Sequence, residues 1–361
     1  MADTWVWVPA FQVTVNGLDL DQKDEAKPIE VAYSDDVDAT DFFSVRLGLV
    51  DNAIEKPGWI DDPLYKEGGK VLIKMGHEGR TLKTMIEGEI TGMEVFFSSR
   101  GPETLVLQGY DRHHRLRRGR KSRTFQNMTD WDIAQKIAGE HGLSPKSGDP
   151  PSIRYEHLYQ NNQTDLDFLK MRATRIGHEV EIENTNLYFR KSQEARSKIA
   201  TLTWGDPDDQ DLISFSPRLS TANQVSEVTV RGWNPKDKKE IVGTARVGDE
   251  TTRMAGTTSG GQAATKAFGT VKTVVVDHPI FDQREADALA RARFNDLSLS
   301  YITGDGVCIG NPDIRAGEVI EVKGFGRRFS GLYYVVSSTH ACGRGAGGYR
   351  TEFSVRRNTG G

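Results

Sequence analysis

Apolar and polar residues alternate in short runs along the first part of the chain, a pattern typical of β-strands with one buried face. Residues 5–15 and 29–33 alternate in this way, and an Asn16-Gly17 turn signal lies between them. Further runs follow at residues 41–50, 70–75, 82–97 and 104–110. Short strands separated by turns indicate an antiparallel barrel or sandwich. We therefore expect one β domain over residues 1–110.

Helical periodicity appears in the next part of the chain, residues 111–215. Thr129 is a suitable N-cap for a helix over residues 130–141, in which apolar residues recur on one face. Thr164 can begin a second helix that ends near residue 176. Strand-like runs accompany the helices at residues 152–159, 180–182 and 186–190. The sequence predicts a small α/β domain between two β regions.

The β pattern returns over residues 216–361. Strands are expected at residues 225–233, 240–247, 319–323, 332–339 and 351–356. Asp282 and Glu285 have the spacing of a capping box and predict a helix over about residues 283–298. Residues 249–270 are rich in Gly, Thr and Ala without apolar periodicity, so we expect a mobile loop there. The overall prediction is a mainly β (α+β) protein.

The two β regions contain a weak internal repeat. KVLIKMG at residues 70–76 aligns with EVIEVKG at residues 318–324. A long strand follows in each copy, EGEITGMEVFF in the first and GLYYVVSSTHA in the second. Each copy then crosses a glycine-containing turn to a last strand, ETLVLQGYDR or YRTEFSVRR. The order is the same although few residues are identical, so we interpret the regions as two related β domains.

Composition excludes several classes of protein. The 361 residues include 47 basic and 51 acidic ones, a net charge of −4 that is too balanced for a dedicated nucleic-acid or acidic-membrane binder. Cys308 and Cys342 are too few for a disulfide framework or a zinc site, and we expect both to be small core residues in a reducing cytoplasm. The N-terminus lacks the features of a signal peptide, and no run approaches the roughly 18 apolar residues of a membrane span.

Basic side chains are concentrated in one short segment. They are Arg112, Arg115, Arg117, Arg118, Arg120, Lys121 and Arg123. This basic segment could track the phosphates of a nucleic acid, or it could lie between subunits or face the lumen of an assembly. Aromatic residues for base stacking are not interleaved with it, so the sequence favours the structural interpretation over nucleic-acid binding.

No catalytic, cofactor-binding or metal site is predicted. His113 and His114 would point to opposite faces of a strand, so one ion could not easily bind both. Residues 343–348 match GxGxxG, but an alternating strand follows where a dinucleotide site needs a helix. The GxSxG and HExxH motifs are absent. Three acidic pairs in turn-like, polar surroundings are typical of solvated surface: Asp35-Asp36, Asp61-Asp62 and Asp208-Asp209. We expect no enzyme activity and no cofactor.

Several segments together resemble a known family. The longest is GYDRHHRLRRGRKSRTFQNMTDWDIAQKIA at residues 109–138. The others are YQNNQTDLDFLKMRATRI at 159–176, LYFRK at 187–191 and VTVRGWNPKDKK at 228–239. They resemble the hub proteins of contractile injection systems, namely phage late-control D proteins, the hub part of VgrG proteins and the hubs of extracellular contractile particles.

The resemblance implies a structural baseplate protein. Such hubs are homotrimers with two tube-like antiparallel β barrels per chain, which form a ring of six similar faces. The ring joins the hexameric inner tube to the trimeric spike and contacts other baseplate proteins. The protein would be made in the bacterial cytoplasm without a signal peptide and would then belong to a virion tail or a released particle.

Two alternatives remain open from the sequence. One is a cell-wall-degrading tail enzyme, and the other, less favoured, is a nucleic-acid-binding module that uses the basic segment. Many relatives continue into an OB domain and a β-helical spike, and this sequence does not contain such repeats. Either the spike is a separate chain, or the sequence is the hub portion alone.

Overall fold

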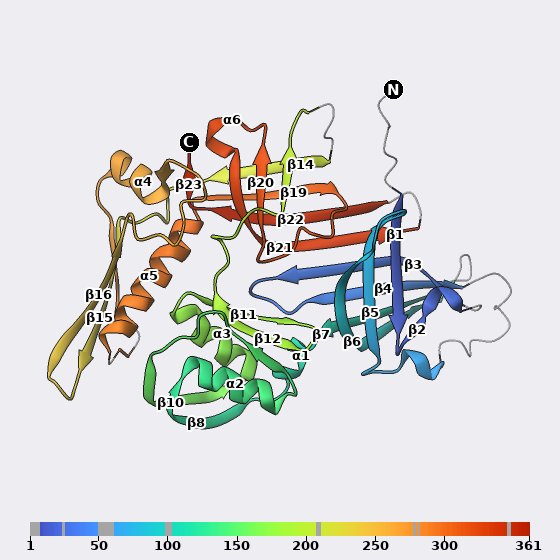
Figure 1. Cartoon of the computed structure of the whole chain (residues 1–361), viewed down its shortest axis with the longest axis horizontal. Coiled ribbons are helices and arrows are strands. Elements are labelled where there is room, and N and C mark those ends of the chain that lie inside the picture. The colour runs from blue at the N-terminus through green and yellow to red at the C-terminus, as the bar shows by residue number, and fades with distance from the viewer. Residues whose placement is uncertain are drawn as a thin grey trace.

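The computed structural model describes residues 8–23, 26–49, 61–97, 103–206, 211–276, 279–280, 282–344 and 348–361. As predicted, the protein is mainly β, with a long antiparallel sheet and several helices grouped to one side of it (Figure 1). Within these ranges, no helix combines the length and the apolar character that a membrane span requires.

Eight strands form the centre of the long sheet, and each pairs antiparallel with its neighbours. In sheet order they are β14 (Leu212–Leu219), β19 (Ile302–Ile309), β22 (Tyr349–Arg357), β21 (Gly331–Gly343), β3 (Ala26–Asp36), β4 (Phe42–Leu49), β7 (Thr104–Asp111) and β6 (Lys83–Phe96). Beyond β6 lie β5 (Lys70–His77), β1 (Pro9–Val15) and β2 (Leu18–Asp19), while β20 (Val319–Lys323) and β13 (Ala200–Thr203) extend from β21. The pairing of β21 with β3 therefore joins the two β regions into one sheet.

The predicted repeat is confirmed at the level of strand pairing. β5, β6 and β7 form an antiparallel meander, and β20, β21 and β22 form the same meander in the second copy. β4 then pairs with β7 as β19 pairs with β22, and β3 and β14 complete the two copies. The copies differ at their far ends, because β1 pairs antiparallel with β5 whereas β13 pairs parallel with β20.

Matching β-bulges show how closely the two copies correspond. The register shifts lie between Ile90 and Gly92 in β6, Val335 and Ser337 in β21, Pro28 and Glu30 in β3, and Leu212 and Ser214 in β14. Each bulge falls at the same place in its copy relative to the neighbouring strand. A bulge adds one residue and increases the local twist, so both copies bend in the same manner.

The middle of the chain contains helices and short strands that share one hydrophobic core. Its elements are α1 (His113–Leu116), β8 (Lys121–Thr129), α2 (Asp130–Glu140), β9 (Ser144–Lys146), β10 (Arg154–Gln163), α3 (Asp165–Arg175), β11 (His178–Glu183) and β12 (Asn186–Lys191). Thr129 and Thr164 cap α2 and α3, and their hydroxyl groups accept from backbone N–H groups at 3.0 and 3.1 Å. Both predicted helices are therefore confirmed.

A separate three-stranded sheet contains the predicted hairpin of the second β region. Its strands are β15 (Glu227–Asn234), β16 (Lys239–Arg246) and β18 (Lys272–Val275), and α5 (Gln283–Leu299) packs on them. Asp282 caps α5 as predicted, and its carboxylate accepts from the N–H of Arg284 at 2.8 Å. The predicted capping box is wrong, because Glu285 binds the guanidinium of Arg175 at 2.8 Å instead.

The expected loop at residues 249–270 contains regular structure. β17 (Thr258–Ser259) leads into α4 (Gly260–Phe268), and Ser259 and Gln262 form a capping box. The helix has few apolar residues to reveal its period, and its glycines are poor helix formers. The remaining short elements are β23 (Thr359–Gly360), α6 (Gly326–Phe329) and the 3₁₀ turns at Leu20–Gln22 and Pro63–Tyr65.

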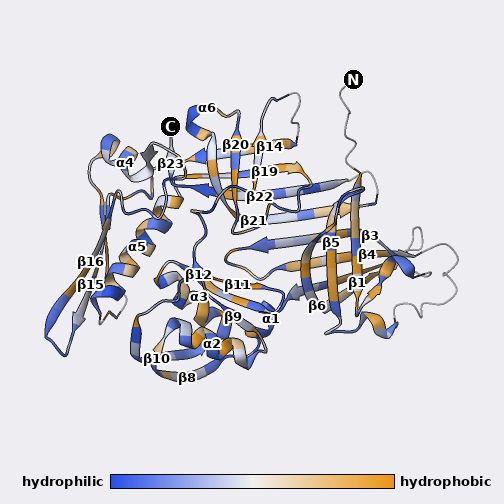
Figure 2. Cartoon of the chain, in the orientation of Figure 1, coloured by the Kyte–Doolittle hydropathy of each residue, from blue (hydrophilic) through white to orange (hydrophobic). Residues whose placement is uncertain are grey.

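Aromatic rings lie directly on glycines in both copies of the repeat. A Cβ atom on Gly109 would lie 2.5 Å from the Phe43 ring, and one on Gly306 would lie 2.3 Å from the Phe353 ring. Figure 2 shows hydrophobic residues along the strands of the long sheet, and both rings belong to the cores beneath it. Glycine at these positions lets the rings approach the backbone closely.

Replacing Gly109 by alanine should therefore destabilise the first copy. The new methyl group would lie 2.1 Å from the carbonyl oxygen of Glu89 as well as against Phe43. Overpacking of this kind costs about 1–3 kcal/mol, measurable as a lower free energy of unfolding in urea. Gly92→Ala is the matched control on β6, because its Cβ would meet nothing within 4 Å. Equal stability of the two variants would contradict the packing argument.

Candidate functional site

Among the described residues, β14 and the second half of β6 each have a partner strand on one side only. β14 pairs with β19 on one side, and residues 92–96 of β6 pair with β7 on one side. The N–H of Ser220 donates to the carbonyl of Tyr301, which immediately precedes the neighbouring strand β19, at 3.0 Å. The backbone N–H and C=O groups of alternate residues of β14 therefore point toward the open edge. Such an edge is a template for another strand.

Large apolar side chains are exposed along both open edges. On β6 these are Met93 and Phe96, with 42% and 62% of their surface exposed, followed by Phe97 with 59%. On β14, Ile213 is 43% exposed. Sequence reasoning missed these edges, because alternation within a strand does not show which strands end a sheet.

The first half of the basic segment is tied to the first copy of the repeat. Arg115 donates two hydrogen bonds to the carboxylate of Glu89 in β6, at 2.8 and 2.6 Å. His114 also contacts Glu89 through Nε2, at 2.8 Å. Glu89 is almost fully buried, and although burial opposes it, hydrogen bonds from Arg115 and His114 lower the pKa of Glu89. This contact holds α1 against the sheet.

The second half of the basic segment binds a buried carboxylate at the start of α3. Asp165 accepts from Lys121 at 2.6 Å and from Arg123 at 2.7 Å, and His141 approaches it at 2.9 Å. Glu140 at the end of α2 binds the same two cations. Burial raises the pKa of Asp165, but the hydrogen bonds outweigh it and lower the pKa to about 2. These cations therefore stabilise the α/β unit.

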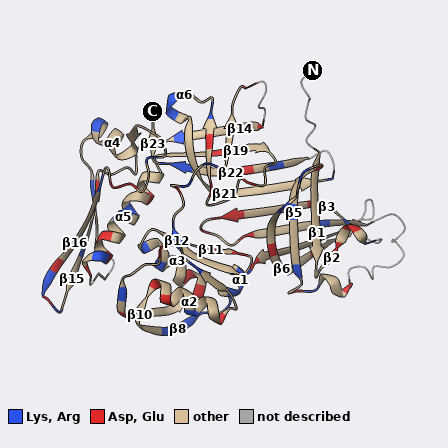
Figure 3. Cartoon of the chain, in the orientation of Figure 1, with Lys and Arg blue, Asp and Glu red and all other residues tan. Residues whose placement is uncertain are grey.

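Four members of the basic segment have no carboxylate partner within the part of the chain that the structure describes. They are Arg112, Arg117, Arg118 and Arg120. Arg117 lies 3.5 Å from the hydroxyl of Thr40, and Arg120 donates to the carbonyl of Asn162 at 2.9 Å. Figure 3 shows acidic and basic residues mixed over the coloured parts of the chain. The free positive charge of the segment is thus smaller than its sequence indicates, and its place between subunits or in a lumen stays a prediction.

The predicted geometry of the adjacent histidines is wrong. His113 and His114 lie in the one-turn helix α1 and not on a strand. They contact different carboxylates, Asp111 for the first and Glu89 for the second. No group of three potential ligands among the described residues has the arrangement of a metal site.

The prediction of a solvated surface is wrong for one member of the acidic pairs. Asp35 is buried, and its carboxylate binds the Arg315 guanidinium at 2.5 Å and accepts from the N–H of Ser338 at 3.1 Å. Arg315 lies 280 residues away in the chain, so no local pattern could indicate this pair. Residues 208 and 209 lie outside the described ranges.

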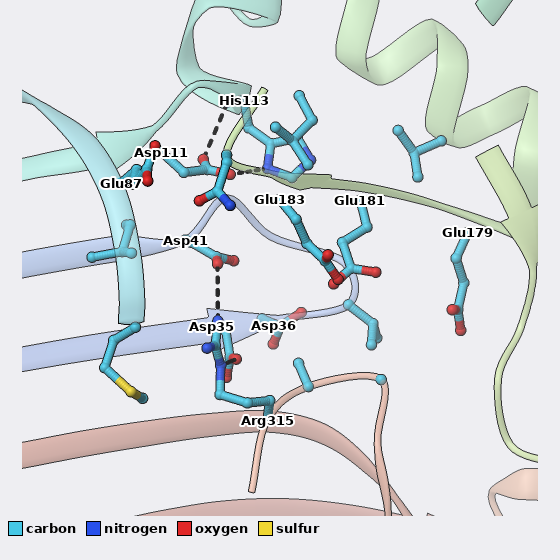
Figure 4. A pocket seen from close by; sticks show the side chains of 18 of the residues that line it. Asp35, Asp36, Asp41, Glu87, Asp111, His113, Glu179, Glu181, Glu183 and Arg315 are labelled. Atoms are coloured by element: carbon cyan, nitrogen blue, oxygen red, sulfur yellow. Dashed lines mark hydrogen bonds and ion pairs between the residues drawn. The ribbon is translucent and has the colours of Figure 1, made fainter. Parts of the chain in front are cut away.

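An acidic pocket of about 270 Å³ lies where the two copies of the repeat meet the α/β unit (Figure 4). Its carboxylates are Asp35, Asp36, Asp41, Glu87, Asp111, Glu179, Glu181, Glu183 and Glu318. Arg315 is the cation that faces them from the loop before β20. These residues come from widely separated segments, so they were not identified as a group from the sequence.

Crowding of carboxylates in this acidic pocket changes their titration. Burial, and then the neighbouring Asp111 and Asp35, hold the pKa of Asp41 well above its usual range. Burial raises the pKa of Glu181 to about 7 against the opposing effect of Arg190. Burial also raises the pKa of Glu179, whose carboxylate accepts from the hydroxyl of Tyr334. The pocket therefore joins three parts of the fold through carboxyl groups whose pKa values are raised.

The two cysteines and the GxGxxG match were the other chemical candidates in the sequence. Cys308 and Cys342 are free and fully buried, as predicted, and burial raises the pKa of each thiol to about 12. The strand β22, not a helix, follows the GxGxxG match, of which residues 345–347 lie outside the described ranges.

Solved structures of tail proteins share this fold. The 43 kDa tail protein of prophage MuSo2 from Shewanella oneidensis has 12% sequence identity and a TM-score of 0.70, with 97% of this chain and 98% of that chain covered. A tail protein from Neisseria meningitidis MC58 has 17% identity and a TM-score of 0.68, with 97% of each chain covered. The c3393 protein of E. coli, a component of the type VI secretion system, has 14% identity and a TM-score of 0.63, with 96% of this chain and 77% of that chain covered.

These likenesses show that the chain has the fold of tail proteins and of a type VI secretion component. None of the curated proteins compared with the chain matches it. A family model described as the Alg8 N-terminal domain matches residues 8–343, which is most of the sequence. The chain therefore belongs to the Alg8 N-terminal domain family.

Proposed function

We propose that this protein is the baseplate hub of a contractile tail or tail-like injection particle. Three chains would form a ring, with two tube-like β units per chain at residues 1–110 and 216–361 and the α/β unit at residues 111–215 between them. One side of the ring would bind the hexameric inner tube protein and the other the trimeric spike. The role would be mechanical, because the ring transmits force and starts tube assembly without a chemical step.

The observation that carries this proposal is the duplicated four-strand unit. The first unit runs β3, β4, β7, β6 and the second runs β14, β19, β22, β21. Within the chain, the β21 edge of the second unit pairs with the β3 edge of the first. The open edges are those of β6, which corresponds to β21, and of β14, which corresponds to β3. The β6 edge of one chain can therefore pair with the β14 edge of another chain, as β21 pairs with β3 within the chain. Three chains then provide six similar units, which suits a partner with sixfold symmetry.

The comparisons support the proposal through the fold. The similar structures are tail proteins and a type VI secretion component. A duplicated unit would let a protein of this fold connect rings of different symmetry. Arg112, Arg117, Arg118 and Arg120, which bind no carboxylate among the described residues, would then face a neighbouring subunit or the lumen. Other baseplate proteins would contact the outer surface of the ring, and the assembled particle would be a virion tail or a released injection machine.

The mass of the protein in solution tests this proposal. Light scattering over a range of concentrations, with and without the matching spike protein, should show a species of three times the chain mass of 40.1 kDa. Cryo-microscopy of that species should show six similar units around its axis. A persistent monomer, even with the spike protein present, would contradict the ring. A stable assembly of two or four chains would contradict the match to a sixfold tube.

A further inference from the structure

We infer that residues 92–97 of one chain pair antiparallel with residues 215–220 of a second copy, in a register that places Glu94 opposite Arg218. This inference rests on the proposed function and specifies the surface by which the copies bind. It follows from the junction that the chain already forms with itself between β21 and β3. That internal junction acts as a template for the junction between chains.

The bulges set the correspondence between β6 and β21. Gly92 lies opposite Gln108 immediately after the bulge in β6, and Ser337 lies opposite Ser354 immediately after the bulge in β21. Counting along each strand from these glycine and serine positions, Val95 corresponds to His340. Glu94 accordingly corresponds to Thr339.

The same reasoning relates β14 to β3. In the first copy, Phe43 of β4 lies opposite Gly109 of β7. In the second copy, Gly304 of β19 lies opposite Val355 of β22, and this pair has the equivalent position. Tyr33 pairs with Phe43, whereas Pro217 pairs with Gly304. Pro217 of β14 therefore corresponds to Tyr33 of β3. The matching bulges of β3 and β14 give the same alignment independently.

Transferring the internal register gives the pairs of the new junction. Inside the chain, His340 lies opposite Tyr33, and Thr339 lies opposite Ser34. The equivalent residues between chains are Val95 opposite Pro217 and Glu94 opposite Arg218. Met93 opposite Leu219, Gly92 opposite Ser220, Phe96 opposite Ser216 and Phe97 opposite Phe215 complete the set.

Side-chain chemistry agrees with this register on both faces. On the core side, Met93, Val95 and Phe97 would meet Leu219, Pro217 and Phe215. All six are apolar, and Phe215 already packs against aromatic rings of the second core. On the opposite face, the exposed Glu94 would meet the exposed Arg218. Ser34 and Thr339 form a hydrogen bond of 3.0 Å at the equivalent place inside the chain. A shift of one residue would place apolar side chains of one strand on the polar face of the other.

Backbone geometry also fits an additional strand. The pattern of hydrogen bonds to β19 turns the backbone of Leu219, Pro217 and Phe215 toward the open edge. Proline has no N–H group, and it is tolerated in a sheet mainly where that group would face an open edge. The Pro217 carbonyl can still accept from Val95 of the second copy. Proline there also weakens pairing with an unrelated strand, which favours the partner whose side chains match.

A cysteine cross-link tests the register directly. Residues 94 and 218 would form a non-hydrogen-bonded pair with Cα atoms about 4.5 Å apart, within the range for a disulfide. The chain with both Glu94→Cys and Arg218→Cys should oxidise to a covalently closed ring of three chains. The native Cys308 and Cys342 are buried and should not interfere. Glu94→Cys with Ser216→Cys, two residues out of register, is the matched control and should cross-link far less.

Charge reversal provides a second measurement that does not use cysteine. Glu94→Arg or Arg218→Glu alone should weaken self-association measurably in light scattering, and the double exchange should restore it, because the pair is then reversed. Both residues are exposed, so none of the three variants should alter the fold.

The outcomes separate this inference from the proposed function. Assembly into a trimer without the cross-link at positions 94 and 218, or with equal cross-linking in the control, would overturn the inferred junction and leave the hub proposal intact. A cross-linked assembly with a number of chains other than three would support the junction and contradict the hub. A monomer at every concentration, with neither cross-link, would overturn both.

Discussion

Replacing Arg172 by methionine should lower the free energy of unfolding of the α/β unit by about 3–5 kcal/mol, the largest effect we expect from a single substitution. Arg172 of α3 donates to Asp130 of α2 through Nε and Nη2, at 2.6 and 3.1 Å. Only 4% and 1% of the two side chains are exposed. Methionine fills a similar volume but leaves the Asp130 carboxylate buried without its counter-charge.

Unfolding in urea, followed by circular dichroism, measures the effect. The double variant Arg172→Met with Asp130→Asn should recover much of the loss, because it removes both buried charges. Arg231→Met is the matched control, since its partner Glu240 and Arg231 itself are more than half exposed. Such a surface pair contributes about 0–1 kcal/mol. A loss for Arg172→Met no larger than for the control would refute the role of burial.

The second large effect is a loss of stability in acid that depends on His340. This histidine is completely buried in β21, beside the junction with β3. Its Nε2 lies 3.0 Å from the carbonyl oxygen of Ile314 and its Nδ1 lies 2.9 Å from the hydroxyl of Tyr349. A neutral ring satisfies both contacts, with Nε2–H donating and Nδ1 accepting.

Burial lowers the pKa of His340 to about 4, with Asp35 opposing the shift and Arg315 adding to it. The unfolded chain binds this proton near pH 6.5, so it carries more protons than the folded chain between about pH 6.5 and 4. The contribution of His340 is therefore complete above pH 6.5 and is lost as the pH falls toward 4. Its size is about 3 kcal/mol.

A comparison of pH profiles isolates this contribution. Glutamine in place of His340 keeps a donor for Ile314 but cannot bind the proton, so His340→Gln should lose less stability than the native chain between pH 7 and 4. His157→Gln, at an exposed position of β10, should follow the native profile. The raised pKa values of Asp41 and Glu181 have the opposite effect, because they increase the free energy of unfolding as the pH falls. This effect is the same in all three proteins. Parallel profiles for His340→Gln and the native chain would contradict the assignment.

The sequence predicted the elements whose signals are local. Thr129 and Thr164 begin α2 and α3 because a hydroxyl group can accept from the N–H three residues later, and that rule needs no tertiary information. Alternation revealed most long strands for the same reason. It failed at β19, where the buried positions include Gly304 and Gly306. Aromatic rings of Phe215 and Phe353 fill the space above these glycines, so the apolar side of β19 is supplied by other strands.

The candidate surfaces required the folded chain. The basic segment was visible in the sequence, but its partners Glu89, Glu140 and Asp165 were not, since folding alone brings them to it. The repeat was also visible, as two meanders in the same order. Which edges remain open depends on the pairing of β21 with β3, and no local pattern in either strand specifies that contact.

The contact between β21 and β3 also bears on how readily a ring could form. Because both strands belong to one chain, this seam closes within a single molecule and does not depend on protein concentration. Each separate association would cost an estimated 4–15 kcal/mol or more in translational and rotational freedom. A ring of six units built from three chains requires fewer such encounters than one built from six. The covalent link between two units in one chain would thus lower the entropic cost of nucleating such a ring, and it would make every second junction of the ring permanent.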